Sequence, residues 1–244
     1  MRRIFIASIF AMLVVSASAQ SATSAPSTSV EQVVSLPKTD WLVGFNMVKI
    51  DGPMNVVFKR VDTPEELRIT YDTKGNITSK FKFEIDRNGV LVVSEKSDPK
   101  RTSVTDITFY YTSLREVRIA HAKAEFEDTI ETQIFDLAIS GGAMASLNIK
   151  TLDTAVECTG VSRLTIGGDT KYLTMRASTA KVDGSRLSTV SSTIEASHSA
   201  EVRLVVSERL EATTSTGAKL LYKGYPTILR DHNAIFGGEI ININ

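Results

Sequence analysis

A row of carboxylates is the set of side chains in this sequence with the clearest chemical potential. Glu157, Glu195 and Glu211 recur at matching places in an internal repeat, with Thr174 between the first two. If these positions stack as neighbours, the carboxylates repel one another, and raised pKa values or a bound cation would relieve the repulsion. Such a face could belong to a polysaccharide lyase or hydrolase, or it could be solvated. Because no His, Arg or further carboxylate converges on these positions, we expect a solvated face.

Other candidate groups offer less. An acidic cluster of Glu125, Glu127 and Asp128 follows His121 and could bind a cation or form a solvated edge. Gly167-Gly168-Asp169 is similar to one copy of a calcium-binding repeat, but that repeat needs successive copies, so we expect a turn. The three histidines and many serines show no spacing that selects a Ser–His–Asp site. We therefore predict no catalytic, cofactor-binding or metal-binding residue.

The composition excludes several classes of protein. The 244 residues include 28 Lys+Arg and 28 Asp+Glu, and 42% are hydrophobic. This balance argues against global disorder and against nucleic-acid binding, which favours a basic chain or a basic block. The one cysteine, Cys158, excludes an intramolecular disulfide and a Cys-based zinc cluster. Cys158 falls at an inward place of the repeat, where a buried thiol is inert.

The N-terminus has the layout of a secretory signal peptide. Arg2 and Arg3 precede an apolar run from Ile4 to Val15, and small residues continue to Ala19 and Gln20. The apolar run is shorter than the ~20 residues that a membrane span needs. We predict cleavage after Ala19 and export to the periplasm, the outer-membrane surface or the extracellular space. No later stretch reaches the length of a membrane helix, so we expect no membrane span in the mature chain.

The rest of the chain alternates with period two, which indicates strands rather than helices. Asp86–Gly89 marks a turn between two such strands and predicts a hairpin. The expected strands are 55–59, 67–71, 81–85, 90–93 and 106–111. The predicted organisation is a signal peptide (1–19), a disordered leader without large apolar side chains (20–29), and one all-β domain (30–244) with N-terminal strands over 30–113 and coils over 114–244.

An internal repeat occupies the second half of the chain. A triplet of small, exposed and apolar residues recurs, with its apolar members 17 to 21 residues apart. The triplets are Ala124-Glu125-Phe126, Ala145-Ser146-Leu147, Ser162-Arg163-Leu164, Ala180-Lys181-Val182, Ala200-Glu201-Val202 and Ala218-Lys219-Leu220. A second element precedes the later triplets, as Leu137-Ala138-Ile139, Val156-Glu157-Cys158, Leu173-Thr174-Met175, Ile194-Glu195-Ala196 and Leu210-Glu211-Ala212.

A near-constant period with two short strands in each unit favours a solenoid over a β-sandwich. Stacked units bury apolar faces that no unit could bury alone. We predict a single-stranded right-handed parallel β-helix with the N-terminal strands and hairpin packed at one end. The apolar members of the triplets should form one internal ladder: Phe126, Leu147, Leu164, Val182, Val202 and Leu220.

The chain resembles the putative auto-transporter adhesin, head GIN domain family of secreted bacterial proteins. Gly44 to Phe58 is similar to the opening strand pair of that family, and Thr216 to Pro226 is similar to its closing element. Between them, Ile139-Ser140-Gly141-Gly142-Ala143 matches a Ser-Gly-rich segment that the family repeats, so the resemblance covers roughly residues 40 to 244. The resemblance implies a β-helix and an adhesin-like role, and it brings no catalytic motif and no cofactor.

The sequence departs from the family pattern at Ser162-Arg163 and at Ala177–Ala180, where glycines are replaced and the turns could differ.

Three classes of function remain. The first is a non-enzymatic adhesin-like module that binds a glycan or a surface protein, and the second is a polysaccharide lyase or hydrolase. The third is an envelope protein that assembles through exposed edges with itself, as a homo-oligomer, or with a partner.

Overall fold

A computed structural model describes residues 36–75, 80–101, 103–233 and 237–244. The chain divides into two compact units, Met1–Gln32 and Val33–Asn244, and the described residues all belong to the second. The predicted signal peptide, its cleavage point between Ala19 and Gln20, and the predicted leader lie outside the described residues.

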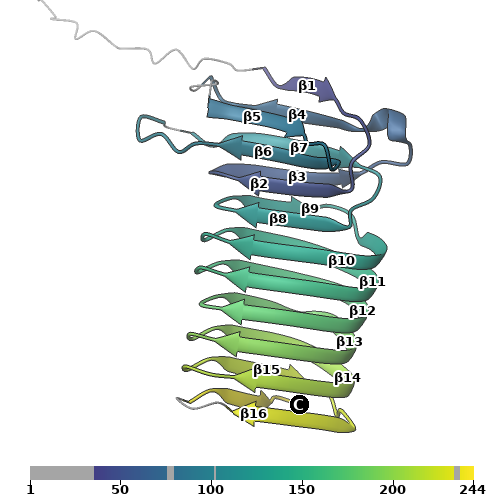
Figure 1. Cartoon of the computed structure of the whole chain (residues 1–244), viewed down its shortest axis with the longest axis vertical. Coiled ribbons are helices and arrows are strands. Elements are labelled where there is room, and N and C mark those ends of the chain that lie inside the picture. The colour runs from purple at the N-terminus through teal and green to yellow at the C-terminus, as the bar shows by residue number, and fades with distance from the viewer. Residues whose placement is uncertain (1–35, 76–79, 102, 234–236) are drawn as a thin grey trace, which may run out of the picture. The chain divides into compact units, whose positions relative to one another are not determined.

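The described residues form strands joined by turns, with one short 3₁₀ helix (Figure 1). The elements are β1 Lys38–Trp41, β2 Met47–Asp51, β3 Met54–Arg60, η1 Pro64–Glu66, β4 Arg68–Asp72, β5 Phe81–Ile85, β6 Val90–Glu95, β7 Thr105–Tyr111, β8 Glu116–Ala120, β9 Lys123–Phe126, β10 Ile130–Ser140, β11 Met144–Thr159, β12 Arg163–Ser178, β13 Lys181–Ser197, β14 Glu201–Thr214, β15 Lys219–Lys223, β16 Ile228–Asn233 and β17 Glu239–Asn242. The predicted all-β class is confirmed, and so are the predicted strands and hairpin, because β5 pairs antiparallel with β6.

Parallel pairing turns most of these strands into a solenoid of about six coils. The long strands β11 to β14 each bend once, so that every coil has a first leg and a second leg that face each other across the core. The first-leg column contains β7, β3, β9, the first parts of β11 to β14, β15 and β17. The second-leg column contains β6, β2, β8, β10, the second parts of β11 to β14 and β16. The solenoid is confirmed, and its right-handed sense stays a prediction.

A stack of tight turns joins each second leg to the next first leg. The backbone takes positive φ there whether or not glycine is present, at +63° in Gly141, +63° in Val161 and +55° in Thr179. Backbone hydrogen bonds link successive turns, as from Val161 N to Thr179 O at 2.9 Å. The turns that lack the family's glycines therefore keep a left-handed conformation, because the stacked hydrogen bonds offset its local cost.

The interior is packed in ladders, and the predicted ladder forms in two parts. Leu164, Val182, Val202 and Leu220 stack as predicted, but this part is shifted by two residues from Leu147. Leu164 pairs with Ala145 on one side and with Val182 on the other, whereas Leu147 pairs with Ile166. All of these side chains are buried, so both ladders are internal. Period-two alternation fixes which residues point inward, but it leaves the register free to shift by two.

The N-terminal strands were predicted to pack at one end of the solenoid, and some of them also form coils within it. The coil of β2 and β3 lies inside the stack, between the coil of β6 and β7 and the coil of β8 and β9. The Phe58 ring on β3 stacks on the Phe126 ring on β9, with 4.2 Å between centroids. Inward apolar side chains of β2 and β3 continue the ladders of the later coils, so burial places them there out of sequence order. Strands β1, β4 and β5 close this end with antiparallel pairing.

Candidate functional site

The predicted row of stacked carboxylates does not exist. On the outer face of the second legs, Glu157 lies beside Arg176, and Arg176 lies beside Glu195. Thr174 and Glu211 belong to a neighbouring row, one step along the strands. The inward residues around Thr174 and around Arg176 have the same pattern of apolar side chains, which is why the sequence alone aligned the wrong residue with Glu157.

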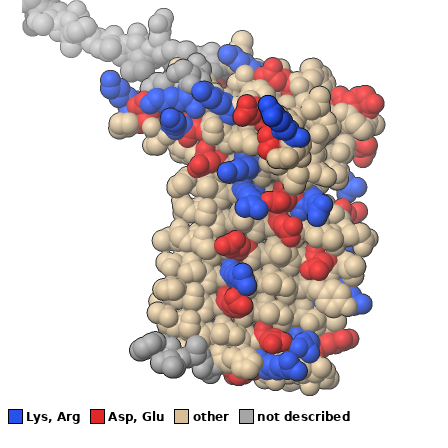
Figure 2. Space-filling view, viewed as in Figure 1, with Lys and Arg blue, Asp and Glu red and all other residues tan. Residues whose placement is uncertain are grey.

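Charges of opposite sign alternate along the row of Glu157, Arg176 and Glu195. Figure 2 shows acidic and basic side chains interspersed on one face of the stack. Arg176 Nε lies 3.0 Å from Glu195 Oε2, and both side chains are more than half exposed. A hydrogen bond from Arg118 to Glu116 raises the pKa of the guanidinium above its usual value. A hydrogen bond from Arg209 lowers the pKa of the Glu211 carboxyl. These two groups are therefore held in their charged forms.

Three alanines interrupt the charged face along a diagonal. Ala120 ends β8, Ala138 lies near the end of β10, and Ala155 lies on the second leg of β11. Ala138 sits between Arg118 on β8 and Glu157 on β11, in the row of charged residues. From β8 to β10 and from β10 to β11, the position of the alanine moves two residues back along the strand. The short side chains therefore form a continuous depression, which we call the alanine groove.

The alanine groove contains two adjoining hollows of about 260 and 270 Å³. Both are lined by Arg118, Ala138 and Glu157. The first also has Glu116, Asp136, Ala155, Thr174 and Arg176 in its lining, and the second has Lys49, Asp51, Ala120, Ser140 and Thr159. The floor is apolar and the walls carry hydrogen-bond donors and acceptors of both charges, on strands fixed by pairing on both sides.

This arrangement suits recognition of a flat polar molecule with apolar faces, such as a sugar ring. Guanidinium groups donate hydrogen bonds in a fixed fork, and carboxylates accept them, so the walls can match hydroxyl groups in both roles. Sequence reasoning missed the alanines and Arg118. The sequence signal that could have revealed the groove is the presence of alanine at outward positions of the repeat where the neighbouring coils have charged residues.

Cys158 and Gly167-Gly168-Asp169, which the sequence also singled out, have structural roles in the solenoid. Cys158 is buried at 1% exposure, and desolvation raises the pKa of its thiol to about 12, which fits the predicted inert role. Gly167-Gly168-Asp169 lies within β12, where the strand bends between its legs, and not in a separate turn as expected. Gly168 has φ +98°, and a Cβ there would come within 2.0 Å of Ile149 O.

The acidic cluster of Glu125, Glu127 and Asp128 contacts the end of β3 in the same chain. Glu127 pairs with Lys59 at 3.0 Å, and the Asp128 carboxylate accepts a hydrogen bond from the Arg60 backbone N–H at 2.8 Å. His121 lies elsewhere, 3.0 Å from Asp51 at the edge of the alanine groove. Among the described residues, no group of three or more His, Cys, Asp or Glu side chains is arranged to hold a metal ion.

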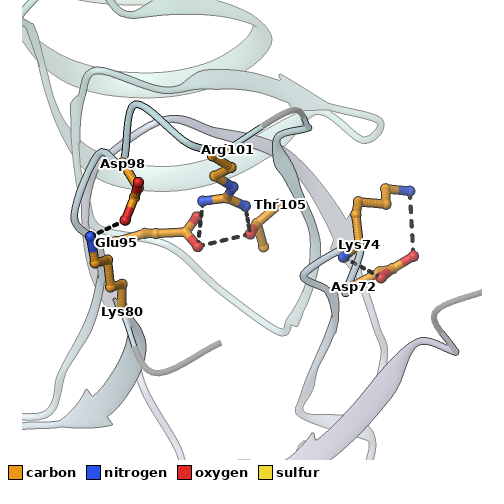
Figure 3. A network of polar contacts seen from close by, with 7 residues as sticks. All are labelled: Asp72, Lys74, Lys80, Glu95, Asp98, Arg101 and Thr105. Atoms are coloured by element: carbon orange, nitrogen blue, oxygen red, sulfur yellow. Dashed lines mark hydrogen bonds and ion pairs between the residues drawn. The ribbon is translucent and has the colours of Figure 1, made fainter. Parts of the chain in front are cut away.

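A buried polar network clamps the loop between β6 and β7 (Figure 3). Arg101 from the loop pairs with Glu95 at the end of β6, and their side chains are 8% and 1% exposed. Thr105 at the start of β7 donates a hydrogen bond to Glu95 Oε1 at 3.1 Å. Lys80 pairs with Asp98 beside them. Because the network joins a loop to both strands that flank it, its role is to hold the loop.

The head GIN domain description matches residues 44–226 of this sequence, from the coil of β2 and β3 to the segment that follows β15. That span is most of the chain and contains the whole alanine groove. The chain belongs to the putative auto-transporter adhesin, head GIN domain family. No protein with a curated description matches it.

Solved structures of similar fold include proteins from Bacteroides and Parabacteroides. A putative adhesin from Bacteroides fragilis superposes with a TM-score of 0.76 at 16% identity, covering 85% of this chain and 96% of that one. A putative adhesin from Parabacteroides distasonis gives 0.68 at 15% identity, with coverage of 85% and 96%. A protein from the same organism described as a putative lipid binding protein gives 0.64 at 12% identity, with coverage of 84% and 96%. At these identities the likeness establishes the fold.

In the described part of the chain, no helix is long and apolar enough to cross a membrane.

Proposed function

We propose that this protein is an exported, non-enzymatic adhesin-like module that binds a surface glycan in the alanine groove. The observation that supports this proposal is the alanine groove. Its apolar floor is bordered by Arg118, Glu157 and Asp136, which lie on strands hydrogen-bonded to one another. Membership of the adhesin family supports a binding role.

The charge state of the face favours binding over acid–base chemistry. A general acid needs a carboxyl whose pKa is raised toward neutrality. The Glu211 carboxyl has a lowered pKa, caused mainly by the hydrogen bond from Arg209. Glu195 is engaged by Arg176. Ion-paired groups of this kind suit hydrogen bonding to hydroxyls.

A glycan-array screen with groove variants tests the binding site. Ala138→Trp fills the groove and should abolish binding of any glycan that the native chain retains. Thr193→Trp places the same bulk on the same face, outside both hollows, and should bind as the native chain does. Equal binding by the two variants would reject the alanine groove as the site.

The non-enzymatic part of the proposal has its own test. Polysaccharides that bind should be incubated with the native chain and with Glu195→Gln, and the products measured by reducing-end release. We expect no turnover by either protein. Turnover that disappears in Glu195→Gln would establish the alternative, a polysaccharide lyase or hydrolase.

Export rests on the N-terminal pattern of Arg2, Arg3 and the small residues before Gln20. Intact-mass analysis of envelope fractions should find a chain that starts at Gln20 or within a residue or two. A stable chain that starts at Met1 would overturn cleavage. Separate fractionation of periplasm, outer membrane and medium would assign the location.

A further inference from the structure

The two columns of legs end unevenly near the N-terminus. The first-leg column continues past β7 with β4 and then β1, whereas the second-leg column continues past β6 with β5 alone. Strand β1 therefore projects one strand further than β5, at the end of the stack seen uppermost in Figure 1. Beside β5 and opposite β1 lies a cavity of about 680 Å³, lined by Lys38, Tyr71, Phe81, Phe83 and others. We call this space the notch.

Both strands that border the notch have a free backbone edge among the described residues. Leu42 N donates to Leu67 O, and the alternation of antiparallel pairing then turns the backbone of Thr39 and Trp41 away from β4. Asp86 N donates to Val90 O, which likewise turns the backbone of Phe81, Phe83 and Ile85 away from β6. Free edges of this kind are sites for strand addition.

We propose that two copies of this chain join end to end, with β1 of each copy filling the notch of the other. A projecting strand and a notch of one-strand width on the same end are self-complementary under a two-fold axis, the symmetry of an isologous dimer. An axis parallel to the strands exchanges the two columns, so that β1 of the second copy lies beside β5 and both columns become continuous.

Strand direction agrees with this assembly. Strand β1 is antiparallel to β4, and β4 is antiparallel to β7, so β1 runs with β7. Strand β5 is antiparallel to β6, the opposite leg of the coil that contains β7, so β5 also runs with β7. A two-fold axis along the strands keeps their direction, so β5 and β1 of the second copy pair in parallel.

The side chains at this junction leave room for one ion pair between the copies. With Thr39 of the second copy beside Lys82, Trp41 of the second copy lies beside Glu84 on the outer face. The Arg68 guanidinium lies over the Tyr110 ring, 3.5 Å from its centroid, and 5.7 Å from the centroid of the Trp41 ring, so in the second copy it would have to turn from Tyr110 across Trp41 to reach Glu84. Glu84 has no ion-pair partner among the described residues, and the junction would supply one.

The solution mass of the purified chain, measured by sedimentation over a range of concentrations, tests the dimer. We expect a concentration-dependent dimer. Thr39→Pro removes a free-edge N–H without touching the hydrogen bonds between β1 and β4, and it should raise the dissociation constant at least about tenfold. Thr39→Ala is the matched control, since it loses only the 3.1 Å hydroxyl contact with Thr70 and should dimerise normally.

A cross-link separates the proposed junction from any other dimer. Thr39 and Lys82 lie on opposite outer faces of one copy, so cysteines at both positions cannot bridge within a chain. The double variant Thr39→Cys/Lys82→Cys should form a covalent dimer under oxidising conditions, and each single variant should not do so through this junction. A chain that is monomeric at all concentrations would overturn the proposal, and so would a dimer that Thr39→Pro leaves intact. If residues before Leu36 fill the notch themselves, the intact chain stays monomeric, which is the same negative result.

Discussion

Arg176 on β12 donates a hydrogen bond to Glu195 on β13, with 3.0 Å between Nε and Oε2. This contact replaces the carboxylate repulsion that the sequence pattern suggests. Glu195→Gln should therefore lower the free energy of unfolding slightly, by less than about 1 kcal/mol, because an exposed pair contributes little. Chemical denaturation measures this, and the pair should weaken further at high salt. A clear gain in stability would show that repulsion dominates the face after all.

Truncating a residue of the core ladder should lower the free energy of unfolding more than breaking the exposed Arg176–Glu195 pair does. Leu164 is buried between Ala145 and Val182, so Leu164→Ala should leave a cavity and cost ~2–5 kcal/mol of unfolding free energy. Its neighbour Arg163 points outward, and Arg163→Ala should cost less than about 1 kcal/mol. Urea denaturation midpoints of the two variants check the order. The reverse order would contradict the observed register.

Gly168 should tolerate no side chain. A Cβ there would meet Ile149 O at 2.0 Å, in a backbone with φ +98°. Gly168→Ala should therefore destabilise the fold by more than about 2 kcal/mol, since both strain and a clash with fixed backbone oppose it. Gly142→Ala is the control, because Gly142 has φ +77° but no atom within 4 Å of its Cβ position. Thermal unfolding should rank Gly168→Ala as the less stable variant, and equal losses would be inconsistent with the clash.

The clamp of Glu95 and Arg101 should matter more than an exposed ion pair. Arg101→Met leaves the Glu95 carboxylate buried without its partner and should cost ~3–5 kcal/mol. The double variant Glu95→Leu/Arg101→Met should recover much of that loss, since no buried charge remains. Lys59→Met, which breaks the exposed pair with Glu127, should have a much smaller effect. Similar midpoints for Arg101→Met and Lys59→Met would show that the clamp is not needed.

Cys158 should make stability fall at high pH. Burial raises the pKa of its thiol from 9.0 to about 12, so the folded chain keeps a proton that the unfolded chain releases. The contribution is fully present below about pH 9 and is lost as the pH rises toward 12. Cys158→Ala should show a shallower decline over that window in pH-dependent denaturation, and an unchanged slope would assign the decline to other groups, such as Tyr111, whose pKa burial also raises to about 12.

The residues that point inward could be predicted from the sequence alone. Strict alternation and the recurring small-polar-apolar triplets predict an all-β solenoid, a buried Cys158 and an inward place for each apolar triplet member, and the structure agrees. The N-terminal hairpin also follows from local turn chemistry at Asp86–Gly89, which needs no information from distant parts of the chain.

The pairing of residues between neighbouring coils could not be predicted in this way and was established by the folded chain. An alternating pattern looks the same after a shift of two residues, so the sequence could not tell that Glu157 meets Arg176 rather than Thr174, or that Leu164 meets Ala145. The stacking order of β2 and β3 was equally hidden, because their interior side chains fit any level of the ladder. The alanine groove exists only at the final register, since Ala120, Ala138 and Ala155 become neighbours when pairing across three strands sets the offset between coils.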